Sequence, residues 1–241
     1  NIALISGIAW DHINVFPTYD FYVEQFEIFI DKITNGGILV YNEDDLEVRR
    51  VAEAATNPIR KIPYTTPKYE VKDGVTLLET PEGGMPIEVF GAHNLNNLAG
   101  AKWICQNMGV DEADFYEAIA SFKGASKRLE KIAEGKGRVA YKDFAHSPSK
   151  VAATTKAVKE QYPNRTLVAC LELHTYSSLN AEFLKEYEGA LEYADEAVVF
   201  YSPDAVKIKQ LEEVTYEQIA KAFNRKDLII YTNPAEFKQY L

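Results

Sequence analysis

Residues 138–173, with the sequence RVAYKDFAHSPSKVAATTKAVKEQYPNRTLVACLEL, decide the fold that we predict for this chain. An apolar stretch at 138–143 is strand-like, and Ser147 followed by Pro148 provides a helix cap and a first-turn proline. The residues after the proline have the apolar spacing of a helix, and 166–173 is again apolar and strand-like. A strand, a helix and a second strand in this order are typical of a parallel βαβ unit.

The same alternation continues toward the end of the chain. Two further strands are predicted at 197–201 and 228–231. One helix follows Asn180 and extends to Leu191, and another begins at Thr215, where Gln218 completes a capping box. We therefore predict an α/β domain built on a mainly parallel sheet of four or more strands, with helices on both faces.

The earlier part of the chain has a different pattern. We predict strands at 1–8 and 38–41, and helices at 19–33, 43–55, 94–108 and 111–122. Residues 61–90 alternate in short segments, with turn signals at Asp73-Gly74 and Gly83-Gly84, which is typical of antiparallel hairpins. The regular alternation starts after residues 122–127, so the expected domains are 1–123 and 124–241. Because the chain opens directly on a strand, we expect it to be cut from a longer protein.

Composition excludes several classes of partner. The chain has 241 residues, an apolar fraction of 46% and a net charge of −10, and an acidic surface repels nucleic acid. No apolar run approaches the roughly 20 residues that cross a membrane. The two cysteines, Cys105 and Cys170, have no metal-ligand spacing, and we interpret them as reduced core thiols of a cytoplasmic protein.

Polar residues follow the predicted strands at the positions where α/β proteins bind ligands, beyond the carboxyl ends of the strands. Three of the four histidines have such positions, and the fourth, His93, opens a helix. The residues at strand ends are Asp11, His12, Asp143, His146 and His174. Each histidine alone could fill a structural role as a cap or in a polar corner. Their shared placement favours a functional site.

Four motifs occur in a fixed order along the chain. They are Ile8-Ala9-Trp10-Asp11-His12, Gly91-x-His93-Asn94-x-x-Asn97-x-x-Gly100, Phe122-x-Gly124-x-x-x-Arg128-x-Glu130 and Asp143-Phe144-Ala145-His146-Ser147-Pro148. In this order and spacing they resemble the Mur ligase family, ATP-dependent amide ligases of bacterial cell-wall synthesis. The resemblance covers essentially the whole chain. It implies that 1–123 is the C-terminal part of the family's central ATPase-type domain, and that 124–241 is a Rossmann-like C-terminal ligase domain.

The resemblance also implies roles for individual residues. It assigns catalysis to His12, Arg128 and His146, ATP binding to His93, Asn94, Asn97, Arg128 and Asp143, and substrate binding to His146 and His174. His12 is the implied ligand of Mg²⁺, although magnesium normally prefers oxygen ligands. Asn94 and Asn97 lie one helical turn apart and suit an adenine edge, but Asn94 could be only a helix cap. Arg128 could instead form a surface ion pair with Glu130.

The family's reaction begins with ATP phosphorylating a carboxylate, which an amine then attacks. The implied partners are UDP-N-acetylmuramate and a short peptide or amino acid. Many members have a modified lysine where this chain has Phe26, and alanine-adding members have a proline and an arginine where this chain has Leu173 and Ser178. Ser147 also replaces a second histidine. These departures favour the branch that attaches the recycled tripeptide L-Ala-γ-D-Glu-meso-diaminopimelate, with the alanine-adding branch as the alternative.

Two other classes of protein are alternatives to a ligase. The missing arginine and histidine are compatible with a non-catalytic nucleotide-binding module of the same fold. A Rossmann-type dehydrogenase would need a G-x-G-x-x-G turn after a strand, and no such turn occurs. The sequence also has no G-x-x-x-x-G-K-[ST] phosphate loop. We therefore expect the N-terminal domain and this loop to lie outside the 241 residues, which alone should lack ligase activity.

Overall fold

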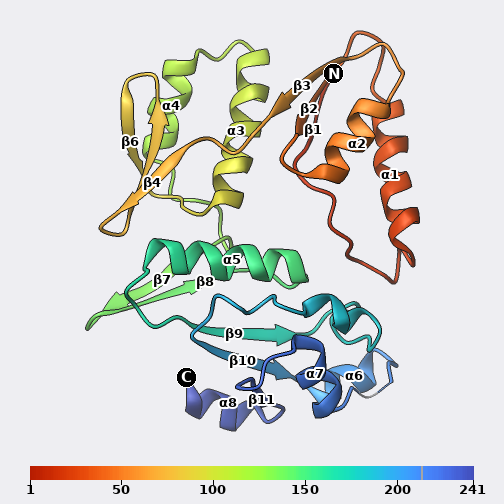
Figure 1. Cartoon of the computed structure of the whole chain (residues 1–241), viewed down its shortest axis with the longest axis vertical. Helices are drawn as coiled ribbons and strands as arrows, with labels where there is room; N and C mark the ends of the chain where they lie inside the picture. Colours follow the sequence, from red (N-terminus) through yellow and green to blue (C-terminus); the bar gives the residue numbers. More distant parts are fainter. Residues whose placement is uncertain (213) are drawn as a thin grey trace. The chain divides into compact units, whose positions relative to one another are not determined.

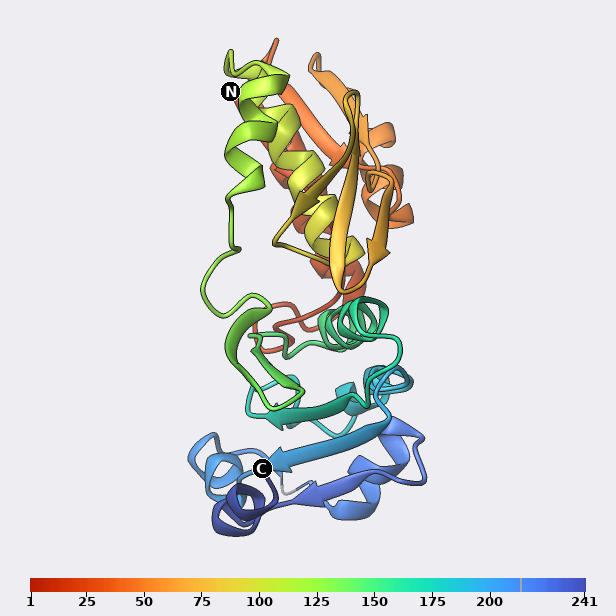
Figure 2. The same cartoon turned by 90° about the vertical axis from the view of Figure 1, so that its left-hand side faces the viewer.

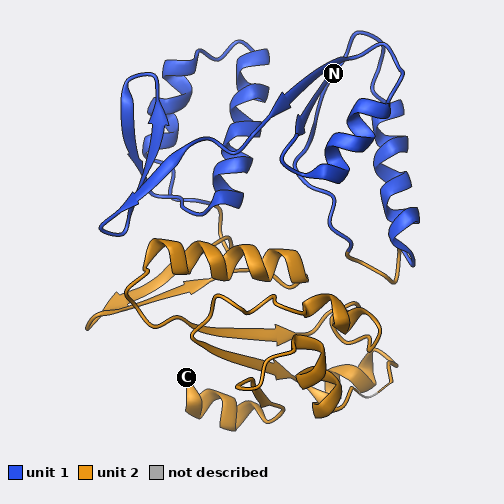
Figure 3. Ribbon diagram, viewed as in Figure 1, with its two compact units in different colours: residues 1–10, 16–124 blue, residues 11–15, 125–241 orange. Residues whose placement is uncertain are grey.

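The chain forms two compact units in a computed structural model that describes residues 1–212 and 214–241 (Figure 3). The first unit comprises Asn1–Trp10 and Phe16–Gly124, and the second comprises Asp11–Val15 and Ala125–Leu241. The short segment Asp11–Val15 therefore belongs to the second unit, although the predicted boundaries placed it within 1–123. No helix in the described part of the chain is long and apolar enough to span a membrane.

A parallel sheet with strand order β1-β2-β3 organises the beginning of the first unit (Figure 1). Its strands are β1 (Ile2–Ile5), β2 (Ile38–Asn42) and β3 (Arg60–Tyr64), with α1 (Tyr19–Asp31) and α2 (Leu46–Ala54) in the connections. Successive residues of a strand point to opposite faces. Accordingly, Leu39 packs with Ile30 and Val48 of α1 and α2, whereas Val40 packs with Ala99 of α3. The sheet is thus covered by helices on both faces, which explains its continuous apolar sequence.

A separate antiparallel sheet contains the predicted hairpins. It consists of β4 (Tyr69–Lys72), β5 (Val75–Thr80) and β6 (Gly83–Ile87). Asp73 and Gly74 have φ angles of 51° and 77°, and this two-residue hairpin turn needs both residues in the left-handed region. The prediction was wrong for β3, which joins the parallel sheet instead. Short alternating segments do not specify which strand they pair with.

Two helices complete the first unit. They are α3 (Ala92–Asn107) and α4 (Glu112–Ala120). Leu95 and Leu98 of α3 pack with Leu78 and Ile87 of the antiparallel sheet, so α3 lies alongside these strands, as Figure 2 shows. On its other side, α3 contacts the parallel sheet through Ala99. A single helix therefore joins the two sheets of this unit.

The second unit contains the predicted parallel sheet, with strand order β11-β10-β9. Its strands are β9 (Val168–Leu173), β10 (Glu196–Tyr201) and β11 (Ile229–Tyr231). Its helices are α5 (Pro148–Gln161), the 3₁₀ helix η1 (Phe183–Tyr187), α6 (Pro203–Ile208), α7 (Tyr216–Phe223) and α8 (Pro234–Tyr240). The predicted capping box at the start of α7 is confirmed, because both of its hydrogen bonds form.

The predicted number of strands was wrong. Among the described residues the parallel sheet has three strands, because β8 (Arg138–Lys142) pairs antiparallel with β7 (Glu130–Gly135). The two are joined by Lys136 and Gly137, whose φ angles of 50° and 74° suit a tight hairpin turn. A local hairpin closes a much shorter loop than pairing with β9 would, which favours it over the predicted βαβ arrangement.

A cavity of about 970 Å³ lies between β8, α5 and β9. Cys170 of β9 lines this cavity and is exposed, so the prediction that it is a core thiol was wrong. Its strand edge is open because β8 pairs with β7 instead. Cys105 in α3 is half-buried, and both cysteines are free thiols.

The helix predicted after Asn180 is shorter than expected. The Asn180 side chain does cap it, since Oδ1 accepts hydrogen bonds from the backbone N–H groups of Glu182 and Phe183. However, only the 3₁₀ turn η1 forms, and it does not reach Leu191. Gly189 has a φ of 74°, a left-handed conformation that interrupts a helix.

Candidate functional site

The predicted nucleotide-binding residues of the first unit lie at the start of α3. Gly91, with a φ of 86°, is the N-cap, so Asn94 is not the cap residue that we considered as an alternative. The Asn94 amide instead donates a hydrogen bond to the carbonyl oxygen of Phe90, at 2.9 Å. Asn97 is exposed one turn later, and His93 is half-buried. Asn97 is therefore accessible to a ligand, whereas one Asn94 donor is already used.

Asn96, which the sequence analysis did not select, is the buried polar residue of this helix. Its Nδ2 donates to Oδ1 of Asn42 at 3.0 Å and to Oγ1 of Thr66 at 3.1 Å. Its Oδ1 accepts from the hydroxyl of Tyr64 at 3.3 Å. Burial, followed by the charge of Asp44, raises the pKa of Tyr64 to about 12. This network fastens α3 to the ends of β2 and β3.

Asp143 holds the backbone around Arg128 in place. One carboxylate oxygen accepts from the N–H of Leu129 at 2.7 Å and the other from the N–H of Ala145 at 2.6 Å. Lys127 and Leu129, on either side of Arg128, both have positive φ, an uncommon conformation for a bulky buried residue such as Leu129. Asp143 thus stabilises a strained turn, and each of its oxygens retains a lone pair for a ligand.

Arg128 is exposed, and its guanidinium lies 5.7 Å from the centre of the Phe144 ring. The ion pair with Glu130 that we considered does not form in the part of the chain that the structure describes. Glu130 instead accepts hydrogen bonds from the Ser126 hydroxyl and the Lys127 N–H. Arg128 therefore keeps its five donors available for an anionic group.

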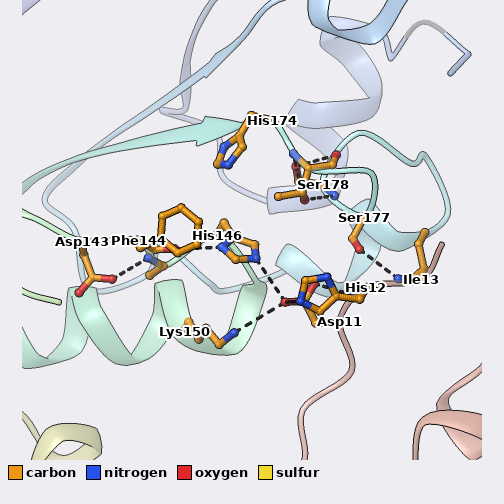
Figure 4. Close-up of polar contacts among 12 residues, drawn as sticks. Asp11, His12, Ile13, Asp143, Phe144, His146, Lys150, His174, Ser177 and Ser178 are labelled. Atoms are coloured by element: carbon orange, nitrogen blue, oxygen red, sulfur yellow. Dashed lines mark hydrogen bonds and ion pairs between the residues drawn. The ribbon is translucent and has the colours of Figure 1, made fainter. Parts of the chain in front are cut away.

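Asp11 is the centre of a cluster of potentially cationic side chains (Figure 4). It is only 4% exposed, and its Oδ1 accepts from the N–H of His12 at 2.7 Å. Three nitrogens face its other oxygen, Oδ2: Nε2 of His146 at 3.3 Å, Nζ of Lys150 at 3.7 Å and Nε2 of His12 at 3.8 Å. Among the described residues, however, none of them makes a well-oriented hydrogen bond to Oδ2.

The His146 ring is held in one orientation. Its Nδ1 lies 2.9 Å from the carbonyl oxygen of Phe144, and its own carbonyl oxygen accepts a hydrogen bond from the buried Tyr187 hydroxyl. The ring therefore presents Nε2 to Asp11. The contact with Asp11 raises the pKa of His146 despite its burial. Burial tends to raise the pKa of Asp11, but the His146 contact, the His12 N–H and the charges of both histidines outweigh it and lower the pKa to about 2.

The segment that carries Asp11 and His12 contacts the loop that follows β9. The N–H of Ile13 donates to Oγ of Ser177 at 3.3 Å. His12 has a φ of 57°, a left-handed conformation in which histidine is enriched, and its side chain is 62% exposed. The ring of His174 lies 6.0 Å from that of His146, centre to centre, and its Nδ1 lies 3.3 Å from the Glu172 carbonyl oxygen.

The second unit therefore brings together Asp11, His12 and His146, with His174 and Phe144 beside them. His93, Asn94 and Asn97 belong to the first unit. The sequence analysis missed Lys150 and Tyr187 as parts of this environment. The position of Lys150 in the first turn of α5, directly after the histidine motif, was a usable signal for it. Nothing in the pattern around Tyr187 indicated its contact with His146.

The donor set of this cluster decides which metals suit it. Asp11, His12 and His146 each offer one ligand atom, and all three atoms lie within 4.8 Å of one another. Mg²⁺ takes oxygen ligands in near-octahedral geometry, whereas this set has one carboxylate and two imidazoles. The three residues therefore do not fit a resident Mg²⁺ ion.

Comparisons with known families match both parts of the chain. Residues 1–105 match the family model described as Mur ligase middle domain. Residues 127–240 match the one described as Mur ligase, glutamate ligase domain. The division between the two compact units, after Gly124, lies between the two matched regions.

The individual proteins that the chain resembles are also Mur ligases. The UDP-N-acetylmuramate–L-alanine ligase of Caldicellulosiruptor bescii is 29% identical over 210 residues, which cover 82% of this chain and 46% of that protein. The chain spans about half the length of the curated relatives it matches.

Solved structures share the fold at low identity. The UDP-N-acetylmuramate-alanine ligase MurC from Thermotoga maritima has a TM-score of 0.66 at 17% identity, covering 100% of this chain and 53% of that one. The murein peptide ligase mpl from Psychrobacter arcticus has a TM-score of 0.60 at 16% identity, covering 99% and 51%.

Proposed function

Because this chain belongs to the Mur ligase family, we propose that it is part of an ATP-dependent ligase that forms an amide on the carboxylate of UDP-N-acetylmuramate. The observation that carries this proposal is the convergence of His12 and His146, from two separate motifs, on the buried Asp11. The relative from Caldicellulosiruptor bescii acts on this nucleotide sugar according to its name, which supports the choice of substrate.

Each unit separately offers groups that suit parts of a nucleotide. Asn97, which is exposed on α3, and Asn94 beside it offer amide groups to adenine, with His93 at the same helix end. The free lone pairs of Asp143 suit ribose hydroxyls, and the unpaired guanidinium of Arg128 suits a phosphate. In an acyl-phosphate reaction these groups act by positioning and charge neutralisation.

His12 and His146 are assigned to the reacting groups. His12, whose side chain is 62% exposed, would contact the Mg²⁺ that accompanies ATP, and the ion would neutralise charge that keeps a triphosphate and a carboxylate apart. His146, whose Nε2 points at Asp11, and the neighbouring His174 are assigned to the incoming amino acid or peptide.

We propose the tripeptide L-Ala-γ-D-Glu-meso-diaminopimelate as the group that is attached. At the position where the alanine-adding pattern has an arginine, this chain has Ser178, which is fully buried and hydrogen-bonded to Thr175. A buried serine cannot contact the carboxylate of a single amino acid. L-alanine is the second candidate, because the curated relatives are named L-alanine ligases.

A competition assay distinguishes the two candidates. The full-length protein is supplied with Mg-ATP, UDP-N-acetylmuramate and an equimolar mixture of L-alanine and the tripeptide, and the products are separated by mass. A tripeptide adduct in at least tenfold excess supports the proposal. An alanine adduct in excess transfers the assignment to the alanine-adding branch, and nucleotide binding without either product supports the non-catalytic module.

A further inference from the structure

The left-handed conformation of His12 is a strained feature that the surrounding residues maintain. Its φ is 57°, and a residue other than glycine pays about 1–2 kcal/mol in this region. Two of the hydrogen bonds around it are local: its N–H donates to Oδ1 of Asp11 at 2.7 Å, and its carbonyl oxygen accepts from the N–H of Val15 at 2.8 Å. A third comes from a distant part of the chain, since the N–H of Ile13 donates to Oγ of Ser177 at 3.3 Å (Figure 4).

Ser177 is a fixed acceptor for that third hydrogen bond. It is 2% exposed and lies in the loop between β9 and η1, beside the fully buried Ser178. Reciprocal hydrogen bonds fasten this loop: the N–H of Thr175 donates to Oγ of Ser178 at 2.9 Å, and the N–H of Ser178 donates to Oγ1 of Thr175 at 3.0 Å. The loop therefore gives the backbone beside His12 an anchor that does not depend on the local segment.

Tyr187 gives His146 a similar anchor. The Tyr187 side chain is fully buried, its hydroxyl donates to the carbonyl oxygen of His146, and it also has a hydrogen bond with the Ser178 side chain. Its ring packs against that of Phe223, with 5.2 Å between the ring centres, which restricts the hydroxyl. Tyr187 thus fixes the backbone of His146, while the contact of Nδ1 with the Phe144 carbonyl oxygen fixes its ring.

We propose that Ser177 and Tyr187 are positioning residues of the ligase reaction, Ser177 acting through His12 and Tyr187 acting through His146. Both side chains are buried and hydrogen-bonded to backbone groups, so they hold the histidines and do not contact a ligand themselves. The inference rests on the proposed function, which assigns the two histidines to the reacting groups. A displacement of a reacting group by about 1 Å can lower a rate by about a hundredfold.

Two substitutions that remove only the hydroxyl groups test this in the full-length protein. Ser177→Ala and Tyr187→Phe should each lower kcat by about tenfold or more, with KM for ATP changed by less than about threefold. Matched controls remove hydroxyls elsewhere in the same unit. Tyr162→Phe removes a hydroxyl that lies 2.6 Å from that of Tyr141, and Thr215→Ala removes one that accepts from a backbone N–H at the start of α7. Both controls should leave kcat within about twofold.

Double-mutant cycles identify the histidine through which each hydroxyl acts. In a His12→Ala background, Ser177→Ala should cause no further loss of kcat, whereas Tyr187→Phe should keep its full effect. In a His146→Ala background the two outcomes should be exchanged. Losses that are the same in every background would overturn the proposal, because they would show that the hydroxyls stabilise the unit without acting through the histidines.

Nitrogen NMR of the histidine rings in the 241-residue chain gives a second readout that needs no ligase activity. Tyr187→Phe should shift the ring signals of His146, and Ser177→Ala should shift those of His12. The signals of His93, which lies in the first unit, should stay unchanged in both variants. These shifts in a protein that forms no amide would count against the proposed function alone. Unchanged His12 and His146 signals, or equal shifts of all the histidines, would refute the positioning roles.

Discussion

Two aspartates and two asparagines show how one residue type takes different roles according to its surroundings. Both carboxylate oxygens of Asp143 accept hydrogen bonds from backbone N–H groups. Asp11 accepts such a bond with one oxygen only, and its other oxygen faces His146. Asn96 is buried and joins two strands, but Asn97 beside it is exposed. Adjacent residues of a helix point in directions about 100° apart, which is enough to separate a structural role from a binding role.

Asp143 should affect ATP more than the nucleotide sugar. In the full-length enzyme, Asp143→Ala removes the proposed acceptor for ribose, and we expect about tenfold weaker ATP binding with a much smaller change for UDP-N-acetylmuramate. Calorimetric titration with each ligand measures both effects. The same change also removes the partners of the Leu129 and Ala145 N–H groups. Equal losses for both ligands would therefore identify a folding defect instead.

Tyr64 predicts a dependence of stability on alkaline pH. Its pKa is raised from the usual tyrosine value of 10.0 to about 12, so the folded state keeps the proton between these values while the unfolded state loses it. This contribution to stability is complete below pH 10 and declines as the pH rises through the folded pKa, by about 1.4 kcal/mol at pH 11.

Tyr64→Phe isolates that contribution. The variant lacks the hydrogen bond to Asn96 and should be about 1 kcal/mol less stable at pH 8. Because it has no phenol to ionise, the difference should disappear by about pH 11. Urea unfolding of both proteins at pH 8, 10 and 11 gives the comparison. A difference that stays constant with pH would mean that Tyr64 does not titrate differently in the folded state.

At the scale of elements, packing and capping decide where helices begin and how closely they approach the sheets. α3 passes so near the parallel sheet that a Cβ on Gly100 would lie 3.0 Å from side-chain atoms of Leu4 and Tyr64. α7 begins with the reciprocal hydrogen bonds between Thr215 and Gln218, at 2.7 and 3.2 Å. The first feature depends on the tertiary fold, and the second is local to the sequence.

Gly100→Val should destabilise the first unit by about 1–3 kcal/mol, because the added methyl groups cannot fit against the buried Tyr64 ring. Asn97→Val, on the exposed side of the same helix, measures the cost of a β-branched residue alone and should change stability by less than about 1 kcal/mol. Thermal unfolding of the two variants checks this. If both lose the same amount, the close approach of α3 to the sheet is not the cause.

Thr215→Ala should destabilise the second unit by about 1 kcal/mol through loss of the capping box. Asp111→Ala is a suitable control, since Asp111 is the N-cap of α4 but makes no side-chain capping hydrogen bond. Chemical denaturation should show a smaller loss for the control. An equal or larger loss at Asp111 would indicate that charge near the helix end, and not the capping hydrogen bond, is what stabilises these helices.

At the scale of the whole molecule, each compact unit has buried side chains of its own. The first contains Ile30, Leu39 and Leu95, and the second contains Tyr187 and Ile219, all of which are fully buried. A chain whose units have separate cores need not unfold in a single step. The short segment Asp11–Val15 adds a part of the N-terminal region to the second unit.

We therefore predict two transitions in differential scanning calorimetry of the 241-residue chain. Gly100→Val should lower the midpoint of one transition, and Thr215→Ala should lower the midpoint of the other, because each change lies in a different unit. Each shift should be on the order of 4–8 °C per kcal/mol for units of this size. A single transition that both variants lower equally would show that the units unfold together.

The sequence by itself determined the features that depend on neighbouring residues. The α/β alternation, the capping box at Thr215 and the hairpin turn at Asp73-Gly74 follow from local spacing and backbone preference, and the structure contains all three. The motifs also singled out His12 and His146, whose side chains both lie close to Asp11. These signals are local because helix caps and tight turns are made by residues within a few positions of one another.

Only the tertiary structure decided which distant segments meet. Backbone N–H and C=O groups are the same in every strand, so the sequence did not reveal that β8 pairs with β7, or that β3 joins the parallel sheet. Nor did the sequence show that Asp11 would turn a buried carboxylate oxygen toward His146, or that Asn96 would be buried while Asn97 is exposed. Such contacts depend on how the whole chain closes its loops and buries its apolar surface, which no short pattern of residues specifies.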